Sequence, residues 1–323
     1  MTRSQLAIVV DTEEEFDWSK PFSRDSRSTD AIPAQALAHR IYDRLGVVPT
    51  YVIDHPVATD RRAQDFLGGL QAAGKAEIGA HLHPWVTPPH EEQVSTYNSY
   101  HCNLPPELER AKIEALTDAI ERGFGRRPTV FKAGRYGFGP NTARVLAELG
   151  YRVDSSYVPH VSFEGDGGPN YYGVPDQPFW LDRPGGLLEV PTTSGYIGHA
   201  AALGPNVRRL FDSPRAARMR LPGLLARSGL VARTRLTPEG VPAAEQCRLI
   251  ETLAKAGRST FVMAYHSPSL APGNTPYVRT KSDLADFLAA IEQVLEWFQG
   301  SLGGRFVPLS EIDAQQRATS AAA

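Results

Sequence analysis

Two histidines stand two residues apart in the stretch EIGAHLHPW, residues 77–85. A β-strand sends alternate side chains to the same face, so His81 and His83 can converge on one ion if the strand continues to Pro84. Catalytic zinc sites often combine three protein ligands with one position left open for water. The spacing therefore indicates a metal-binding pair that needs a third ligand, and the alternative is two hydrogen-bonded core histidines.

An acidic run, DTEEEF, follows the apolar residues 6–10 and supplies candidates for that third ligand. Asp11 comes directly after two valines and should share their burial, whereas Glu14 and Glu15 also fit a solvated face. Asp11 and Glu13 lie on one side of an extended chain. This pattern suggests Glu13 as a metal ligand and Asp11 as a general base, because a metal lowers the pKa of its water enough for a carboxylate to suffice.

A third candidate, His266, ends the apolar segment of MAYHSPSL, residues 263–270. One interpretation is a general acid that protonates a leaving amine, and the other is a structural cap on a strand end. Asp154 is expected to hydrogen-bond the second ring nitrogen of this histidine and stabilise the imidazolium. Arg135 or Lys132 is expected to hold Asp11 in its ionised form.

These residues all follow short apolar runs that alternate with helical patterns. The alternation predicts parallel strands covered by helices, in an α/β fold that forms a single distorted (β/α)7-8 TIM-like barrel. In such barrels the carboxyl ends of the strands carry the chemistry. Strands are expected at residues 6–10, 47–53, 76–82, 129–134, 151–158, 187–193, 259–266 and 305–312, and helices at 33–46, 61–75, 105–125, 140–150 and 282–298.

Five short segments, in this order, resemble the motifs of the NodB-homology polysaccharide deacetylases, carbohydrate esterase family four. They are VDTEEEF, EIGAHLHPW, FKAGRYG, GYRVDSSYVP and FVMAYHSPS. The resemblance covers residues 6 to about 300. The amino-acid sequences of DTEEEFDW, HLHPW and HSPSLAPGNTPYVR are most similar to those of the WalW-like branch. That branch is associated with bacterial surface-polysaccharide biosynthesis.

The resemblance implies a hydrolase of carbon–nitrogen amide bonds other than peptide bonds, which removes acetate from an acetamido sugar. It implies Asp11 as base, His81 as metal ligand and His266 as acid oriented by Asp154. The backbone amide of Tyr136 would help to bind the oxyanion. Candidate substrate-binding residues are Tyr136, Lys132 and Trp85. The cofactor would be a divalent ion, zinc before cobalt, nickel, manganese or magnesium.

Three departures from the family pattern leave alternatives open. Thr12 separates the two acids of the first motif, so the ligand is Glu13 or Glu14, with strand parity favouring Glu13. Trp85 stands where the second motif usually has its second histidine, so His83 is the substitute and His90 and His101 are further candidates.

The third departure is Lys132, which occupies the usual arginine position of the third motif, so Arg135 is expected to orient Asp11 instead. These departures also keep two other functions open. One is an amidohydrolase that acts on a cyclic amide or ureide, and the other is a catalytically degenerate sugar-binding protein.

Composition limits the partners. A formal net charge of -2 gives no general support for nucleic-acid binding. Residues 200–236 carry eight arginines among apolar residues, which suggests a lid for a nucleotide-linked or lipid-pyrophosphate-linked sugar, or peripheral contact with the inner membrane. Those arginines are Arg208, Arg209, Arg215, Arg218, Arg220, Arg227, Arg233 and Arg235.

The expected organisation is a deacetylase-like barrel over residues 1–315, with an irregular, Arg-rich insertion at about 159–240 and a disordered tail at 316–323. The only apolar run near the amino terminus has five residues, too few for a signal sequence or a membrane span. A cytoplasmic location is therefore expected, and the sequence indicates no oligomeric state.

Overall fold

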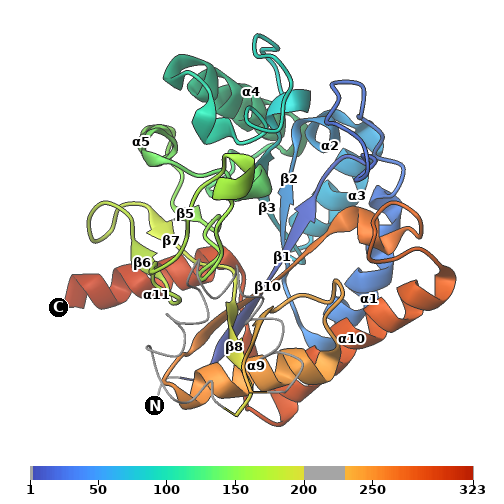
Figure 1. The fold of residues 1–323 in the computed structure, drawn as a ribbon, viewed down its shortest axis with the longest axis vertical. Helices are drawn as coiled ribbons and strands as arrows, with labels where there is room; N and C mark the ends of the chain where they lie inside the picture. Colours follow the sequence, from blue (N-terminus) through green and yellow to red (C-terminus); the bar gives the residue numbers. More distant parts are fainter. Residues whose placement is uncertain (1–2, 200–229, 323) are drawn as a thin grey trace.

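A mostly parallel sheet forms the centre of the molecule and curls into a distorted barrel, as seen in a computed structural model that describes residues 3–199 and 230–322 (Figure 1). The strands are hydrogen-bonded in the order β10-β1-β2-β3-β4-β5-β7-β6, and β11 pairs with β1. Their bounds are β1 Gln5–Thr12, β2 Thr50–Ile53, β3 Glu77–Leu82, β4 Val130–Ala133, β5 Val153–Asp154, β6 Phe179–Trp180, β7 Leu188–Glu189, β10 Thr260–His266 and β11 Arg305–Phe306.

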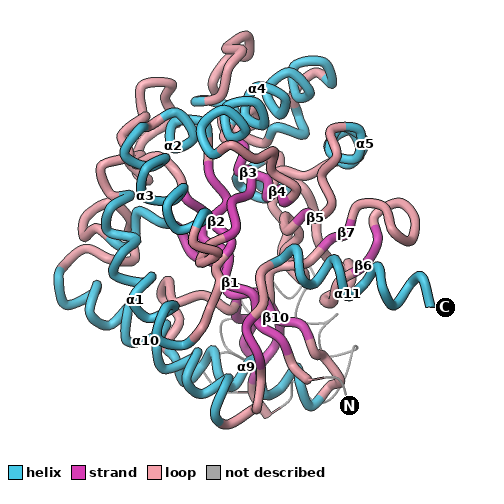
Figure 2. Tube along the Cα trace, turned by 180° about the vertical axis from the view of Figure 1, so that it is seen from behind, coloured by secondary structure: helices cyan, strands magenta, loops and turns pink. Residues whose placement is uncertain are grey.

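Helices cover the outside of this sheet (Figure 2). The Gly46 position illustrates how the sequence ends them: its φ of 69° is left-handed, which a residue without a Cβ adopts at little cost. The α-helices are α1 Gln35–Leu45, α2 His55–Thr59, α3 Arg61–Ala72, α4 Pro106–Phe124, α5 Pro140–Glu148, α9 Ala243–Lys255, α10 Lys281–Gly300 and α11 Leu309–Ala322.

The central strand β1 is buried at all eight positions because sheet neighbours flank it and side chains cover both of its faces. β10 pairs with it over seven residues, from Gln5 opposite Thr260 to Asp11 opposite His266. Near-continuous apolar strands of this kind are typical of parallel sheets under helices. The prediction of a distorted parallel α/β barrel is confirmed.

Segment 188–193 begins in β7 and runs on to β10, the first strand in the sheet order. The Val190 N–H donates to the Asp154 carbonyl at 2.8 Å, beside β5, and the Thr193 N–H donates to the Val262 carbonyl at 3.2 Å, beside β10. The barrel is thus completed by backbone hydrogen bonds outside regular strands. Leu236, in the segment after residue 230, bonds both Thr193 and Ala264 of β10, so that segment lies close to the end of β10.

The region predicted as an insertion contains a two-stranded antiparallel sheet, β8 Ser194–Ile197 with β9 Ala232–Arg235. Of the eight arginines in segment 200–236, Arg233 and Arg235 are described by the structure. The other six, Arg208, Arg209, Arg215, Arg218, Arg220 and Arg227, lie outside the described residues. The domain boundaries at 159 and 240 therefore stay predictions.

The expected disordered tail at 316–323 is wrong for the residues that the structure describes, because α11 continues to Ala322. Contacts hold this helix against the β6–β7 hairpin. Arg317 donates to the Gly186 carbonyl at 2.7 Å and its guanidinium lies 5.3 Å from the centre of the Trp180 ring. The indole N–H of Trp180 in turn bonds Ser320 at 3.3 Å.

Within the part of the chain that the structure describes, no helix is both long and apolar enough to cross a membrane.

Candidate metal-dependent active site

The polar ends of four strands meet at one rim of the barrel. Asp11 lies opposite His266 across β1 and β10, and His81 lies opposite Lys132 across β3 and β4. A cavity of about 350 Å³ opens here, with Asp11, Glu13, His81 and His266 in its wall. The structure therefore places these predicted side chains together at one rim, as strand ends were expected to do.

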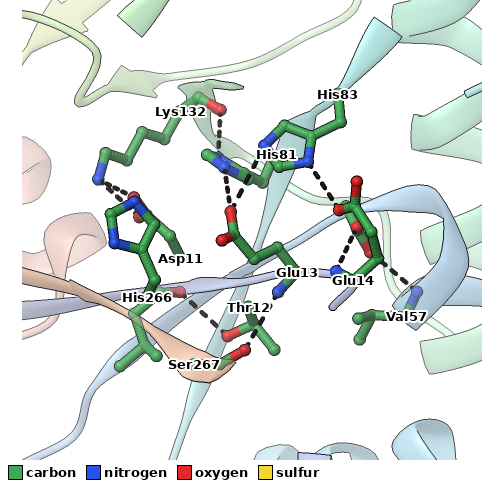
Figure 3. Close-up of polar contacts among 12 residues, drawn as sticks. Asp11, Thr12, Glu13, Glu14, Val57, His81, His83, Lys132, His266 and Ser267 are labelled. Atoms are coloured by element: carbon green, nitrogen blue, oxygen red, sulfur yellow. Dashed lines mark hydrogen bonds and ion pairs between the residues drawn. The ribbon is translucent and has the colours of Figure 1, made fainter. Parts of the chain in front are cut away.

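Glu13, His81 and His83 converge on one point, and each is at most 2% exposed. Figure 3 shows both imidazoles directed toward the Glu13 carboxylate. Its Oε2 lies 3.5 Å from Nε2 of His81 and 3.4 Å from Nε2 of His83. One ligand atom from each residue falls within 4.8 Å of the others, which is suitable spacing for a metal ion.

Partners behind the histidines fix which nitrogen faces this point. His81 Nδ1 bonds the Lys132 carbonyl at 3.0 Å, and His83 Nδ1 bonds Glu14 Oε2 at 2.7 Å. A carbonyl only accepts, so His81 Nδ1 donates and Nε2 keeps its lone pair for a metal. Burial lowers the pKa of His83 to about 4 and that of His81 well below its usual range, so both rings are neutral at pH 7.

Without a bound ion, the buried Glu13 carboxylate is the destabilising member of this group. Burial raises the pKa of its carboxyl well above the usual range, and its Oε1 is buried without a hydrogen-bond partner among the described residues. A divalent cation that binds the carboxylate would stabilise its buried charge and give Oε1 a partner. Two imidazole nitrogens and one carboxylate oxygen match a catalytic zinc donor set, so these residues fit the metal that the sequence implied.

Glu14, the alternative ligand, contacts Nδ1 of His83, on the side of the ring away from Glu13. Its Oε1 accepts from the Trp85 indole N–H at 2.7 Å while Oε2 contacts His83, and burial raises the pKa of Glu14 to about 7. Glu14, Asp54 and His83 also have metal-ligand spacing, but Glu14 already bonds the His83 nitrogen that would face such an ion. Trp85, predicted as a substrate-binding residue, lines the cavity and also orients Glu14.

The other two histidine alternatives lie elsewhere. His101 is fully buried and bonds Glu109 at 2.9 Å through Nδ1. His90 Nε2 lies 3.1 Å from the Arg27 guanidinium. Neither belongs to a group with metal-ligand spacing among the residues that the structure describes.

Lys132, and not Arg135, holds Asp11. The Lys132 ammonium is 2.6 Å from each Asp11 oxygen and fully buried. Burial lowers the pKa of Lys132, but the charge and hydrogen bond of Asp11, together with the charges of Tyr136 and Glu13, outweigh it, and the pKa is raised. The predicted role of Arg135 is wrong, because its guanidinium bonds Asp166 at 2.9 Å and Ser99 at 2.6 Å instead. Direct substrate binding by Lys132 is also wrong, since its ammonium is enclosed against Asp11.

Glu239 orients His266, so the prediction that Asp154 does so is wrong. One Glu239 oxygen lies 2.8 Å from His266 Nδ1, and the other accepts from the His266 backbone N–H at 3.1 Å. Nε2 of His266 points toward Asp11, 3.9 Å from its nearer oxygen. Burial opposes the charged ring, but the carboxylates of Glu239, Glu13 and Asp11 raise the pKa of His266 to about 9.

Asp154 lies deeper in the barrel. Its carboxylate accepts from Ser156 Oγ at 2.7 Å and from the Ser156 backbone N–H at 3.1 Å. Burial raises the pKa of both Asp154 and Glu189, which lies opposite it across β5 and β7. Ser155 is tied to the same region through the Val190 carbonyl at 2.7 Å.

Aromatic rings form much of the cavity wall, among them Phe16, Trp18, Phe22, Tyr100, Tyr136 and Tyr277. Trp18 meets the His266 ring edge-on at 5.1 Å and the Tyr277 ring at 5.8 Å. Tyr136 follows a left-handed Arg135 and has a φ of 60° itself, which turns the chain sharply beside the cavity. Its part in oxyanion binding stays a prediction.

Lys112 of α4 ties down the loop after the two histidines and permits a stability test. Its fully buried ammonium bonds the carbonyls of Pro84, Thr87 and Pro89 at 2.6–2.9 Å and the Glu92 carboxylate at 3.0 Å. Lys112→Met should lower the free energy of unfolding by about 3–5 kcal/mol, because it breaks a buried ion pair with Glu92 and removes the donor of three carbonyls.

Urea unfolding measures this loss. The control is Lys255→Met, which removes the ammonium that pairs with Glu251 from a side chain that is 74% exposed. It should change stability by less than about 0.5 kcal/mol. Equal stability of the two variants would contradict the role given to Lys112.

The Glu239–His266 contact predicts a pH effect. In protein stripped of metal by a chelator, Glu239→Gln should lower the pKa of His266 from about 9, because a neutral amide no longer stabilises the imidazolium. The raised folded-state pKa stabilises the native protein fully below about 6.5, and this contribution is lost as pH rises through about 9. Imidazole NMR titration and urea unfolding at several pH values measure both effects; an unchanged pKa would contradict the contact.

Comparison with solved structures shows which class of fold carries this site. A Mycobacterium smegmatis protein assigned as a polysaccharide deacetylase has a TM-score of 0.54 and 18% identity, over 98% of this chain and 91% of the other. The Puue allantoinase gives 0.55 and 14%, over 98% and 90%. A Pseudomonas aeruginosa PAO1 protein assigned as a probable polysaccharide deacetylase gives 0.53 and 14%, over 97% and 90%.

The chain therefore shares one barrel fold with proteins assigned as deacetylases and with an allantoinase. No protein-family model matches the chain, and none of the curated proteins matches it in sequence.

Proposed function

We propose that this protein is a metal-dependent hydrolase that removes the acetyl group from an acetamido sugar. The observation that carries the proposal is that three separate groups of residues lie at one cavity. These are the Glu13–His81–His83 group, Asp11 held by Lys132, and His266 held by Glu239. Hydrolysis of an amide needs each of them: an electrophile for the carbonyl, a base for water and an acid for the nitrogen.

The residues divide the reaction as follows. A divalent ion held by Glu13, His81 and His83 would supply Lewis-acid polarisation of the carbonyl and a lowered water pKa. Asp11 accepts a proton from the attacking water, whose oxygen adds to the carbonyl carbon. His266, protonated at pH 7 with a pKa of about 9, then gives its Nε2 proton to the nitrogen as the C–N bond breaks. Acetate and a free amine leave.

The backbone amide of Tyr136 is proposed to stabilise the developing oxyanion. The left-handed turn at Arg135 and Tyr136 supports this role, because both residues line the cavity. The aromatic rings around the cavity suit a sugar ring, since their faces pack against its C–H groups while the polar cluster reaches the acetamide.

The motif resemblance supports a finer assignment as well. We place the protein in the NodB-homology family, nearest its WalW-like branch, with a substrate from bacterial surface-polysaccharide biosynthesis and a cytoplasmic location. A nucleotide-linked or lipid-pyrophosphate-linked sugar is the form in which such substrates are assembled, and segment 200–236 is the proposed contact with it or with the membrane surface.

One assay separates the proposal from its rival. The allantoinase has the same fold, so ring opening of a cyclic ureide is the second candidate. Zinc-loaded protein should release acetate from N-acetylated amino sugars and leave allantoin and hydantoin unopened. Ring opening without acetate release would replace the proposal with the second candidate, and bound metal with neither activity would favour a sugar-binding protein.

A further inference from the structure

One lysine and two arginines line the cavity, and their partners differ. Lys20 pairs with Asp17 at 3.0 Å near the surface. Arg135 pairs with Asp166 at 2.9 Å and lies against the Tyr100 ring, 4.3 Å from its centre. Arg235 also lines the cavity, and within residues 3–199 and 230–322 no carboxylate lies within ion-pair distance of it.

The acids nearest the cavity are already engaged. Asp11 faces Lys132, and Glu13 faces the two histidines. Glu239 is the acid closest to Arg235 in sequence, but its oxygens are used by His266 and by the Ser269 hydroxyl at 2.6 Å. The guanidinium of Arg235 therefore brings a positive charge into the cavity that these carboxylates do not neutralise by direct contact.

The backbone fixes where this charge sits. Arg235 ends β9 opposite Ser194, and the next residue is tied on both sides: the Leu236 N–H donates to Thr193 at 2.9 Å, and its carbonyl accepts from Ala264 at 3.2 Å. Four residues later the same segment supplies Glu239 to His266. One rigid stretch of chain thus places both the guanidinium and the group that orients the proposed acid.

We infer that Arg235 recognises an anionic substituent, a phosphate or a carboxylate, on the sugar whose acetamide is hydrolysed. This inference rests on the proposed function and names its substrate class. The guanidinium lies beside the phenols of Tyr136 and Tyr277, which line the same cavity and leave it partly desolvated. In such surroundings a planar guanidinium binds phosphate or carboxylate through paired hydrogen bonds.

The size of the cavity limits what else is bound. About 350 Å³ lies at the small end of the range for small-molecule sites. It suits one sugar ring with its acetamide and one charged substituent, so the anionic group belongs to the sugar that reacts or is attached directly to it.

The test compares the deacetylation of neutral and anionic probes by zinc-loaded protein. The neutral probe is the methyl glycoside of N-acetylglucosamine. The anionic probes are N-acetylglucosamine 1-phosphate, N-acetylglucosamine 6-phosphate and N-acetylglucosaminuronic acid, which separate phosphate from carboxylate recognition. Wild-type protein should favour at least one anionic probe by about tenfold to a hundredfold in kcat/KM, as expected for a hydrogen-bonded charge pair.

Variants assign that preference to Arg235. In Arg235→Gln the ratio of kcat/KM for the best anionic probe to that for the neutral probe should fall close to one, and Arg235→Lys should keep part of it. The control is Lys20→Gln, which removes a cation already paired with Asp17 and should keep the full ratio. A wild-type ratio near one, or a full ratio in Arg235→Gln, would overturn the inference while acetate release still supports the proposed function.

If no probe is deacetylated, the proposed function fails and binding decides the inference separately. Trp18 and Trp85 line the cavity, so tryptophan fluorescence reports its occupation. Anionic probes should bind wild-type protein more tightly than the neutral probe does, and Arg235→Gln should abolish the difference. Equal affinity of wild-type protein for all four probes would refute anion recognition.

Discussion

Asp11→Asn should lower kcat for deacetylation by about 10³-fold, the range expected for loss of a general base. The amide of asparagine does not take the proton of the attacking water. Because Asp11 is not one of the three convergent ligands, the variant should still bind one metal ion per chain. The measurements are steady-state acetate release and metal content after gel filtration.

The same substitution leaves the buried Lys132 ammonium without its countercharge, so some stability is lost as well. A double variant, Asp11→Asn with Lys132→Met, removes both charges and should recover much of that stability without recovering activity. This pair separates a chemical role from a structural one. Activity above about a tenth of wild type in either protein would contradict Asp11 as the base, because general-base loss costs at least about 10²-fold.

His81→Ala should weaken metal binding by more than the ~10- to 100-fold that loss of an outer partner of a metal ligand costs. Activity should fall in parallel at limiting metal and be partly restored by excess zinc. The reason is geometric: Nε2 of His81 is one of only two imidazole nitrogens facing Glu13 in the described residues. Competition with a chromogenic chelator gives the affinity.

The matched control is His90→Ala. His90 was an alternative to His83 as a ligand on sequence grounds, but its ring lies beside Arg27 and outside the convergent group. Its removal should leave zinc affinity within about threefold, since no contact to the metal ligands is lost. Similar losses in both variants would mean that the metal lies elsewhere.

Strand periodicity was sufficient to predict that Glu13, His81 and His83 lie together. His81 and His83 share a face because they alternate with Leu82 at the end of β3, and Glu13 follows β1 with the parity of Asp11. The barrel and most of its strands were predictable for the same reason, since buried parallel strands are continuous apolar runs. Local rules succeeded wherever one strand determines the direction of a side chain.

The same rules failed where partners come from distant segments. No local pattern distinguishes Glu239 from Asp154 as the partner of His266, because the choice depends on how the loop after β9 packs against β10. Gly134 is a similar case: a Cβ there would come within 2.3 Å of the His83 ring, so the third motif helps to position a residue of the second. The helix α9, whose apolar face packs on β8, was also not predicted.

Lys132 was misassigned for a related reason. Sequence reasoning favoured Arg135 as the partner of Asp11 on family precedent, but the left-handed backbone at Arg135, with φ at 51°, turns its side chain toward Ser99 and Asp166. Lys132 lies within β4, opposite His81, and reaches Asp11 directly. A lysine therefore serves here where the related pattern has an arginine.

The most direct test of the central claim is anomalous X-ray diffraction from crystals grown with zinc, recorded on both sides of the zinc absorption edge. We expect one strong peak at the barrel rim, bonded to Nε2 of His81, Nε2 of His83 and a Glu13 oxygen at roughly 2.0–2.2 Å. Crystals without a peak at this position, or with zinc held by other residues while these three side chains stay apart, would contradict the proposed active site.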